Sequence, residues 1–380
     1  MNDFIVELRR EFHKIPELGF QEYETNTLIT KTLSSLDVTY TTNVAGTGVL
    51  VSFGTGHPHV AFRAEIDGLP ICEENDVEYK STKDGYMHAC GHDAHIAVLI
   101  DSIMKTKLLF ETENPKGKVT FIFQPCEETK NQEGLSGGQL ISEIPLLADV
   151  DYFFAAHVES TLETGKFFVR EGGLTAAIDK FDVDIFGVPG HGAYPHQTVD
   201  PIWLAISAIQ LINTLESRIA NTAYPSVISV CTIEGGTAWN VIPEKVSFGG
   251  TIRTFSENER KIIHDKLKCC LETVKLLGGK YTLDISRGNP SVINSLQACN
   301  MVKEAVKKVV GEQAISEIEI QMGGDDFSYY AQKKPSCYFY VGAKKDSVSR
   351  QHHSSVFDID EGVLQNISNI YLQIIKGVIL

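Results

Sequence analysis

The feature that most constrains the fold of this chain is a change of hydrophobic periodicity near residue 178. Before that point, Lys118 to Phe123 and Asp151 to Val158 are strand-length runs, nearly continuous in apolar residues, and helical patterns alternate with them. Such strands are typical of an α/β domain whose largely parallel sheet is buried on both faces. Beyond that point, Phe181, Val183 and Ile185 alternate with acidic residues, which predicts a strand buried on one face only.

The segment after residue 178 has the element order of a small independent unit. A helix from Pro201 and a second from Asn258 to about Leu277 separate four predicted strands, in the βαββαβ order of a ferredoxin-like split unit. After about residue 290, helix and strand patterns of the first kind resume. The sequence therefore predicts a larger α/β domain, residues 1–177 and 290–380, in which helices flank a largely parallel mixed sheet. A ferredoxin-like βαββαβ domain is inserted at residues 178–289.

Charge and composition exclude several classes of partner. The formal net charge is −15 over 380 residues, whereas a nucleic-acid-binding face is basic. The chain opens with a charged amphipathic stretch, and no apolar run approaches the roughly 18 residues that span a bilayer. We therefore expect a soluble, cytoplasmic protein with neither nucleic acid nor membrane as a partner. The eight cysteines are widely spread, which favours thiols or metal ligands over a disulfide framework.

A short loop from Met87 to His95 carries a metal-binding pattern. Cys90 and His92 are separated by one glycine, so a thiolate and an imidazole can reach the same metal ion. The alternative for this loop is a buried cysteine beside a helix cap, since Asp93 could cap a helix that runs to about Phe110.

Three further clusters lie where predicted elements end. Glu127 and Glu128 close a buried strand and point to opposite sides of it, so one can be a metal ligand and the other a general base. His157 ends another buried strand, and His352 and His353 lie in a polar stretch near the C-terminus. Taken singly, the carboxylate pair is equally well explained by an acidic turn, whereas a core histidine and an exposed polar loop are the favoured explanations of the other two clusters. Together with the Met87 loop they indicate a site for zinc, or for manganese, nickel or cobalt.

The predicted inserted domain has its own cluster of glycines and polar side chains. The cluster comprises Gly190 to His196, Gly235 to Pro243, and Arg253. The residues themselves leave two explanations open: a set of turns beside an interior arginine, or a group that contacts a substrate.

Several segments resemble the sequence blocks of a known enzyme family. They are Phe62 to Pro70, Met87 to His95, Phe121 to Glu128, His191 to His196, Asn240 to Pro243 and Phe357 to Glu361. In this order they are similar to the aminoacylases, hippurate hydrolases and indoleacetyl-amino acid hydrolases, two-metal relatives of carboxypeptidase G. The resemblance covers essentially the whole chain. Departures at Gly68, Cys126 and Asp325, where the family often has alanine, alanine and glutamate, bear on substrate preference and leave the ligand set intact.

The resemblance implies two divalent metal ions and five protein ligands. The implied ligands are Cys90, which would bridge the ions, and His92, Glu128, His157 and His353. His353 is preferred over His352 because it lies four residues before Phe357, as in the family block.

The same resemblance implies catalytic and substrate-contacting residues. Glu127 would be the general base, and Asp67 would orient a ligand imidazole. The residues implied to contact the substrate or its oxyanion are His191, Asn240, Arg253 and Gly324, the last in a loop from Gly323 to Phe327.

The activity implied is metal-dependent hydrolysis of the amide bond of N-acyl-L-amino acids, with acetyl, benzoyl or similar acyl groups. One alternative is a dipeptidase or aminopeptidase of the same family. Another is a metal-binding module without catalysis, against which the presence of both Glu127 and Glu128 argues. A thiol redox protein is a third alternative, but the chain has no Cys-x-x-Cys pair.

The inserted domain is expected to act as a lid and to form a homodimer. Every implied metal ligand lies in the larger domain, whereas His191 lies in the inserted one. In dimeric relatives this histidine enters the active site of the partner, so the resemblance implies the same here. A four-stranded layer also leaves an edge, and the strand around Val183 is expected to pair with a second copy.

Overall fold

The computed structural model describes residues 2–221 and 224–380. The chain forms two compact units. The larger unit comprises Met1–Gly172, Ile293–Glu319 and Asp326–Leu380, and the smaller unit comprises Gly173–Val292 and Ile320–Asp325. Within the described ranges, no helix combines the length and the apolar composition needed to cross a membrane.

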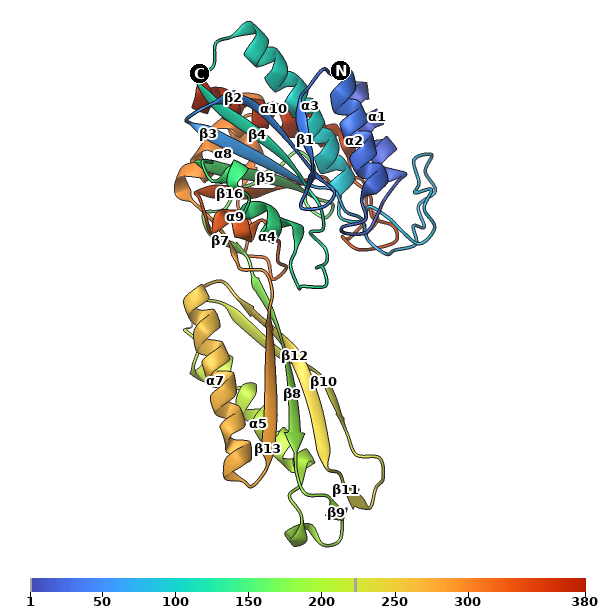
Figure 1. Cartoon of the computed structure of the whole chain (residues 1–380), viewed down its shortest axis with the longest axis vertical. Helices are drawn as coiled ribbons and strands as arrows, with labels where there is room; N and C mark the ends of the chain where they lie inside the picture. Colours follow the sequence, from blue (N-terminus) through green and yellow to red (C-terminus); the bar gives the residue numbers. More distant parts are fainter. Residues whose placement is uncertain (1, 222–223) are drawn as a thin grey trace. The chain divides into compact units, whose positions relative to one another are not determined.

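The larger unit is built on an eight-stranded mixed sheet, which confirms the predicted α/β fold class (Figure 1). The strand order is β1-β2-β4-β3-β5-β16-β6-β15. The strands are β1 (Tyr40–Val44), β2 (Gly48–Thr55), β3 (His59–Glu65), β4 (Gly117–Gln124), β5 (Tyr152–Glu159), β6 (Phe167–Phe168), β15 (Ile315–Ser316) and β16 (Ser336–Gly342). The helices are α1 (Asn2–His13), α2 (Tyr23–Ser35), α3 (His92–Thr112), α4 (Gly137–Ser142), α8 (Leu296–Val309), α9 (Ser328–Ala331) and α10 (Leu364–Ile379).

The centre of this sheet is parallel and fully buried. Strand β3 pairs in parallel with β4 and β5, and β16 pairs in parallel with β5. Every residue of β3 is buried, because α3 and α10 pack on the sheet and share its hydrophobic core. Parallel strands end at a common edge, so the carboxyl ends of β3, β4 and β5 lie together, the usual place for a site in an α/β sheet.

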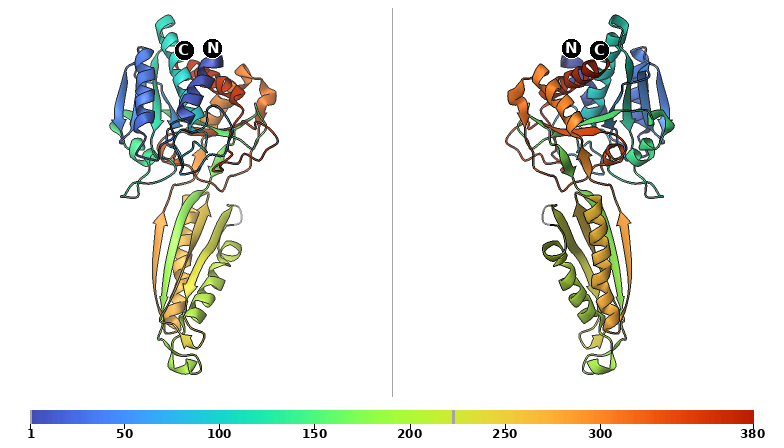
Figure 2. Two further views of the ribbon diagram at one scale, coloured as in Figure 1. Left: turned by 90° about the vertical axis from the view of Figure 1, so that its right-hand side faces the viewer. Right: turned by 90° about the vertical axis from the view of Figure 1, so that its left-hand side faces the viewer.

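The smaller unit is a four-stranded antiparallel sheet with helices on one face (Figure 2). The strand order is β10-β12-β8-β13. Its elements are β8 (Ala177–Phe186), β9 (Gly190–His191), α5 (Pro201–Ile212), α6 (Leu215–Arg218), β10 (Ser226–Gly235), β11 (Val241–Ile242), β12 (Lys245–Thr254), α7 (Glu257–Leu276) and β13 (Lys280–Arg287). Helices α5 and α7 contact each other and the sheet, and their apolar sides join one core.

The position of β8 corrects the expectation for Val183. Strand β8 is hydrogen-bonded to β12 on one side and to β13 on the other, so it has no free edge. Its alternating burial was predicted from the sequence, but alternation reports which face is buried and carries no information about the order of strands. The strands at the two edges of this sheet are β10 and β13.

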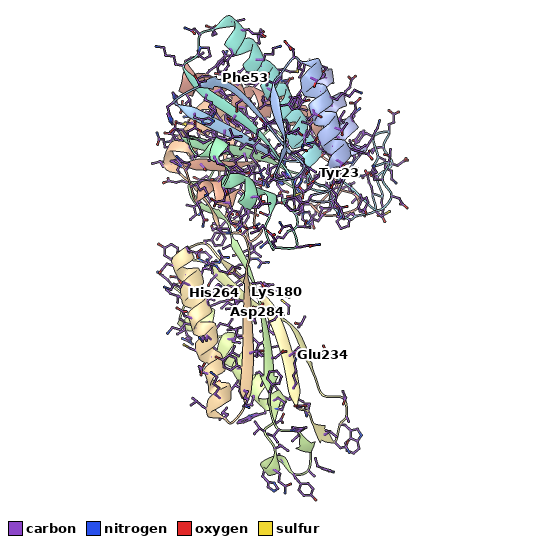
Figure 3. The ribbon with its side chains drawn as sticks, in the orientation of Figure 1. Tyr23, Phe53, Lys180, Glu234, His264 and Asp284 are labelled. Carbon is purple, nitrogen blue, oxygen red and sulfur yellow. The ribbon has the colours of Figure 1, made fainter. Side chains whose placement is uncertain are left out.

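A buried ion pair ties α7 to β8 in the smaller unit. The Asp179 carboxylate accepts hydrogen bonds from the Arg260 guanidinium, from His264 Nε2 at 2.7 Å and from the Gly288 backbone N–H at 3.0 Å. His264 projects from α7 in Figure 3. Burial alone would raise the pKa of Asp179, but the hydrogen bonds from Arg260 and His264 hold it well below its usual value.

We expect Asp179→Ala to lower the free energy of unfolding by about 3–5 kcal/mol, because it leaves the buried Arg260 charge without its main partner. Urea denaturation measures this loss. Lys180→Ala is the control, since the neighbouring Lys180 side chain is 67% exposed, and we expect it to change stability by less than about 0.5 kcal/mol. Because the folded pKa of Asp179 is depressed, its contribution is present above the unfolded pKa of about 3.9 and is lost as the pH falls below it. Equal stability of the two variants at neutral pH would contradict this role.

Candidate metal centre

A glycine allows the loop before α3 to lie close against β5. Gly91 is the N-cap of α3 and has a φ of 88°, a left-handed conformation that favours glycine. A Cβ atom at this position would lie 2.4 Å from Val158 Cγ2 on β5. The close approach places Cys90 Sγ 3.5 Å from His157 Nε2. Asp93 was expected to cap this helix, and that prediction is wrong: Asp93 lies in the first turn, where its carboxylate pairs with His13 and Arg9.

His92 presents one ring nitrogen with no hydrogen-bond partner among the described residues. Its Nδ1 lies 2.8 Å from the Asp67 carbonyl oxygen and 3.2 Å from Asp67 Oδ1, so this nitrogen carries the proton and donates it. Nε2 is buried and has no hydrogen bond within the described part of the chain, so in the neutral ring it offers its lone pair. One ligand atom each of Cys90, His92 and Glu128 lie within 4.8 Å of one another. A buried imidazole nitrogen aimed at a thiol and a carboxylate is the donor set that a divalent cation requires.

Glu127 and Glu128 follow the end of β4 at a strained bend. Cys126 has a φ of 47°, a conformation that residues other than glycine rarely adopt. The backbone N–H of Glu128 donates to Asp67 Oδ2 at 3.0 Å, so one Asp67 carboxylate holds both the His92 ring and the Glu128 backbone. The bend thereby brings the Glu128 side chain to the Cys90 and His92 group.

His157 and the two histidines of the C-terminal loop lie around Cys90. The Nδ1–H of His157 donates to the Val158 carbonyl at 2.8 Å, which leaves Nε2 facing Cys90 Sγ. His352 Nδ1 lies 3.6 Å from the same sulfur, and His353 Nε2 lies 3.1 Å from Glu128 Oε1. The preference for His353 over His352 as a ligand stays a prediction.

Cys90 is common to two groups of potential ligands. One is Cys90, His92 and Glu128, and the other is Cys90, His157 and His352. Burial, and then the nearby Glu128, raise the pKa of the Cys90 thiol well above its usual value, so a thiolate at this position needs a neighbouring positive charge. The described residues therefore fit two divalent cations, with Cys90 a member of both ligand groups.

Buried ion pairs that were not predicted from the sequence support this centre. His95 Nδ1 lies 2.9 Å from Glu65 Oε2, and its Nε2 accepts the backbone N–H of Val158 at 3.0 Å. Glu65 also pairs with Arg63, whose guanidinium reaches Asp326 at 2.6 Å. The only available signal was two opposite charges in the otherwise apolar strand from His59 to Glu65. These contacts hold the strand end that carries His157.

The residues predicted to contact substrate lie in the smaller unit, apart in the chain from the metal ligands. His191 in β9 pairs with Val241 in β11, and the Gly192 N–H donates to the Asn240 carbonyl at 2.9 Å, so His191 and Asn240 are neighbours. Arg253 lies near the end of β12, whereas Asn240 and β11 precede its start, and Arg253 is paired with Ile178 on the neighbouring strand β8. Gly324 is packed tightly, since a Cβ atom there would lie 2.5 Å from Ile178 Cδ1.

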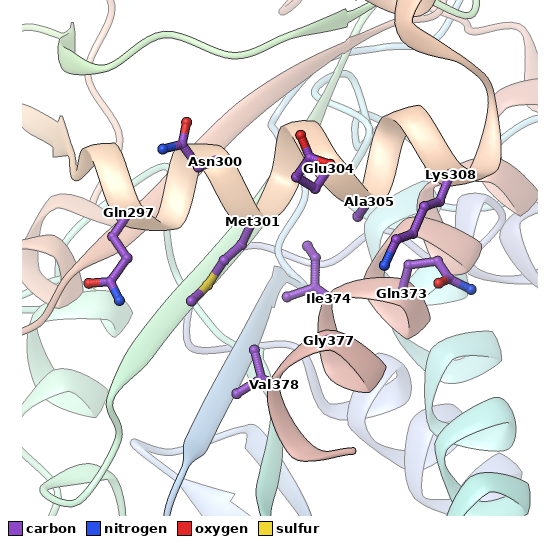
Figure 4. Close-up of a pocket in the computed structure, with 10 residues that line it drawn as sticks. All are labelled: Gln297, Asn300, Met301, Glu304, Ala305, Lys308, Gln373, Ile374, Gly377 and Val378. Atoms are coloured by element: carbon purple, nitrogen blue, oxygen red, sulfur yellow. The ribbon is translucent and has the colours of Figure 1, made fainter.

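A separate groove of about 390 Å³ lies between α8 and α10 (Figure 4). It is lined by Gln297, Asn300, Met301, Glu304, Ala305, Lys308, Gln373, Ile374, Gly377 and Val378. None of these side chains belongs to the ligand groups around Cys90, so this groove is distinct from the candidate metal centre.

The two C-terminal histidines offer a matched test of the ligand set. We expect His353→Ala to lower the metal content of the purified protein, because the imidazole beside Glu128 is a ligand in the preferred assignment. In the preferred assignment His352→Ala is expected to retain its metal, although His352 Nδ1 lies 3.6 Å from Cys90 Sγ, because its Nε2 is paired with Glu159 at 3.3 Å. Elemental analysis of both variants decides the matter, and metal loss confined to His352→Ala would reverse the assignment.

The chain is similar to a known peptidase family and to several individual proteins. The sequence model of Peptidase family M20/M25/M40 matches residues 61–377. Thermostable carboxypeptidase 1 of Saccharolobus solfataricus is 34% identical over 378 residues, covering 96% of this chain and 93% of that protein. N-acetylcysteine deacetylase of Bacillus subtilis is 32% identical, covering 97% and 95%. The crystal structure of the Bacillus subtilis YXEP protein, described as a dinuclear metal-binding peptidase of family M20, has a TM-score of 0.84 at 30% identity, covering 98% and 97%.

Proposed function

Because this chain belongs to peptidase family M20/M25/M40, we propose that it hydrolyses the amide bond of N-acyl-L-amino acids at a centre of two divalent metal ions. Family membership supports a hydrolase of amide bonds, and the acyl amino acid is the finer part of the proposal. The observation that carries it is the pair of ligand groups that share Cys90, with Glu127 adjacent in sequence to the group member Glu128. Zinc or manganese suits this donor set, with nickel or cobalt also compatible.

The side chains around the centre divide the chemical work. When bound, the two cations would supply a water acidic enough to lose a proton near neutral pH. Glu127 takes that proton and delivers it to the nitrogen of the leaving amino acid. Asp67 keeps the proton on His92 Nδ1, and therefore keeps Nε2 available as a donor of electrons. Glu128, His157 and His353 complete the ligand set around Cys90.

Four residues of the smaller unit are proposed to contact the substrate. His191 donates a hydrogen bond to the oxyanion of the tetrahedral intermediate, with Asn240 beside it. Arg253 binds the carboxylate of the amino acid through its planar guanidinium, and Gly324 contributes close backbone contact. Burial lowers the pKa of Arg253, and its usual value is so high that the side chain remains a cation at neutral pH.

The geometry of the smaller unit supports a homodimer in which His191 acts on the partner subunit's substrate. Arg253 is paired with Ile178 at the start of β8, whereas β9 and His191 follow the end of β8 at Phe186. The length of that strand separates them by roughly 25 Å, more than one acyl amino acid can bridge. If His191 and Arg253 contact the same substrate, they therefore come from different copies of the unit.

Exposed apolar side chains on the smaller unit also support self-association. Trp203 and Ile206 on α5 are 53% and 47% exposed, and Trp239, beside Asn240, is 97% exposed. The outer edge of β10 carries Ile233, which is 58% exposed. Such residues on an edge strand and its neighbouring helix are suited to a symmetric interface. We propose that the homodimer is cytoplasmic.

A peptidase activity is the second candidate function. The 34% identical relative is named a carboxypeptidase, which favours peptide substrates, whereas the relative named N-acetylcysteine deacetylase favours small acyl groups. A dipeptidase or aminopeptidase would have to recognise a free amine.

The proposed activity is tested by turnover of N-acetyl and N-benzoyl amino acids against matched dipeptides, with Zn²⁺ or Mn²⁺ added. We expect the wild-type protein to prefer the acyl amino acids. Glu127→Gln should retain its metal and lose roughly 10²–10⁴-fold in kcat, the usual contribution of general acid–base catalysis.

Glu128→Gln is the matched control, because it changes the adjacent carboxylate in the same way. We expect it to lower the metal content, since Glu128 belongs to the ligand group with Cys90 and His92. Metal loss in Glu127→Gln and full metal in Glu128→Gln would exchange the two roles. Preference for dipeptides by the wild-type protein would favour the second candidate function.

The trans arrangement is tested by mixing two inactive variants, His191→Ala and Glu127→Ala, under conditions of subunit exchange. If His191 acts on the partner subunit, half of the dimers are mixed and half of their sites are complete. Random exchange then gives roughly a quarter of the wild-type activity. With exchange verified by differently tagged subunits, an inactive mixture would rule out the trans arrangement.

A further inference from the structure

A buried carboxylate outside the metal-ligand groups supports the bend that carries Glu127. Glu22 precedes α2 and has no exposed surface. Its Oε1 accepts the backbone N–H of Cys126 at 2.9 Å, and its Oε2 accepts the Thr47 hydroxyl at 2.5 Å. Glu22 and Cys126 are 104 residues apart in the chain, so this contact exists only in the folded protein.

The bend needs external support because its backbone is strained. A left-handed conformation is unfavourable for a residue other than glycine and persists only where its surroundings hold it. At Cys126, with a φ of 47°, the N–H is held by Glu22 and the carbonyl by the Gly137 N–H at 2.9 Å. Two residues on, the Glu128 N–H is held by Asp67. Glu127 therefore lies between two backbone groups that are both fixed by buried carboxylates.

The segment before α2 is shaped to bring Glu22 to this bend. A Cβ atom at Gly19 would lie 2.6 Å from Cys126 Sγ, so only glycine allows the segment to lie this close. The Glu17 carbonyl accepts the Gly68 N–H at 2.7 Å, which ties the segment to the loop that carries Asp67. Burial, and then the charge of Asp67, raise the pKa of Glu22 to about 7, which shows how unfavourable a carboxylate is in this place.

We propose that Glu22 is a positioning residue for the general base Glu127, acting through the backbone N–H of Cys126. The proposal rests on the role given to Glu127 under the proposed function. Glu22 touches neither the ligand groups nor the substrate in this assignment. It fixes the direction in which the chain leaves β4, and so the place from which the Glu127 carboxylate reaches the water. A displacement of about 1 Å in such a group lowers turnover by up to about 10²-fold.

The test compares Glu22→Ala with Glu22→Gln on the intact metal-loaded protein. Alanine removes the acceptor of the Cys126 N–H. Glutamine keeps an oxygen for it, and its amide can donate to Thr47 in place of the hydroxyl's own donation. We expect Glu22→Ala to keep its metal and its KM within about twofold and to lose roughly 10- to 100-fold in kcat. Glu22→Gln should recover most of that loss.

Glu17→Ala is the control for a purely structural effect. The Glu17 carboxylate accepts the backbone N–H groups of Glu24 and Thr25 at the start of α2, whereas the Cys126 N–H in the bend is bound by Glu22. Its removal should lower the unfolding midpoint and leave kcat within about twofold of wild type.

Three results would overturn the positioning role of Glu22. They are wild-type kcat in Glu22→Ala, a loss of metal in parallel with kcat, and equal losses in Glu22→Ala and Glu22→Gln. Failure of the proposed function is distinguishable, because it would appear as unchanged turnover in Glu127→Gln or as no turnover of acyl amino acids by the wild-type protein.

Discussion

The arrangement of the candidate metal centre depends on the two contacts of the Asp67 carboxylate. One of its oxygens lies against the His92 ring and the other accepts the Glu128 backbone N–H, so it joins the first residue of α3 to the bend after β4. The bend is irregular and follows the end of its strand, so this contact helps to fix it. A charged acceptor with two oxygens can set the relative position of an imidazole and a backbone amide in a way that a neutral side chain cannot. The loop that carries Asp67 is itself held in place, since the Gly68 N–H donates to the Glu17 carbonyl.

Buried charge surrounds the centre in an amount that stability alone does not explain. Arg63, Glu65 and Asp326 are each nearly or fully buried, and so are Arg9, Asp93 and Asp358 on the other side of α3. Replacing such pairs by apolar residues often leaves stability unchanged or increases it. Their geometry is directional, however, and apolar packing is not. We interpret these networks as the means by which an ordinary α/β core holds irregular loops in a fixed position.

The fold class and the main sequence clusters could be predicted from local pattern. Continuous apolar runs indicated β4 and β5, and alternation of apolar and polar residues indicated β8. Both patterns lie within one strand, so they are visible in the local sequence. The order of strands was not predictable in this way, which is why Val183 was wrongly placed at an edge. Glu22 and His95 were missed because their partners, Cys126 and Val158, are distant in the chain. The choice between His352 and His353 was not decided by local pattern, because the two are adjacent in the chain and each lies beside a different candidate ligand, Cys90 or Glu128.

The pairing of β8 with β12 has a consequence for how this chain can change over time. The register runs without interruption from Ala177 opposite Thr254 to Phe186 opposite Lys245. Inserting a single residue would turn every later side chain to the opposite face of the sheet and expose the core side of the strand. Away from a bulge such as the one between Val230 and Thr232 of β10, length therefore changes in matched pairs of residues on both strands, in steps of roughly 7 Å. The span between Ile178 and Phe186 is therefore either kept unchanged or altered in steps of this size.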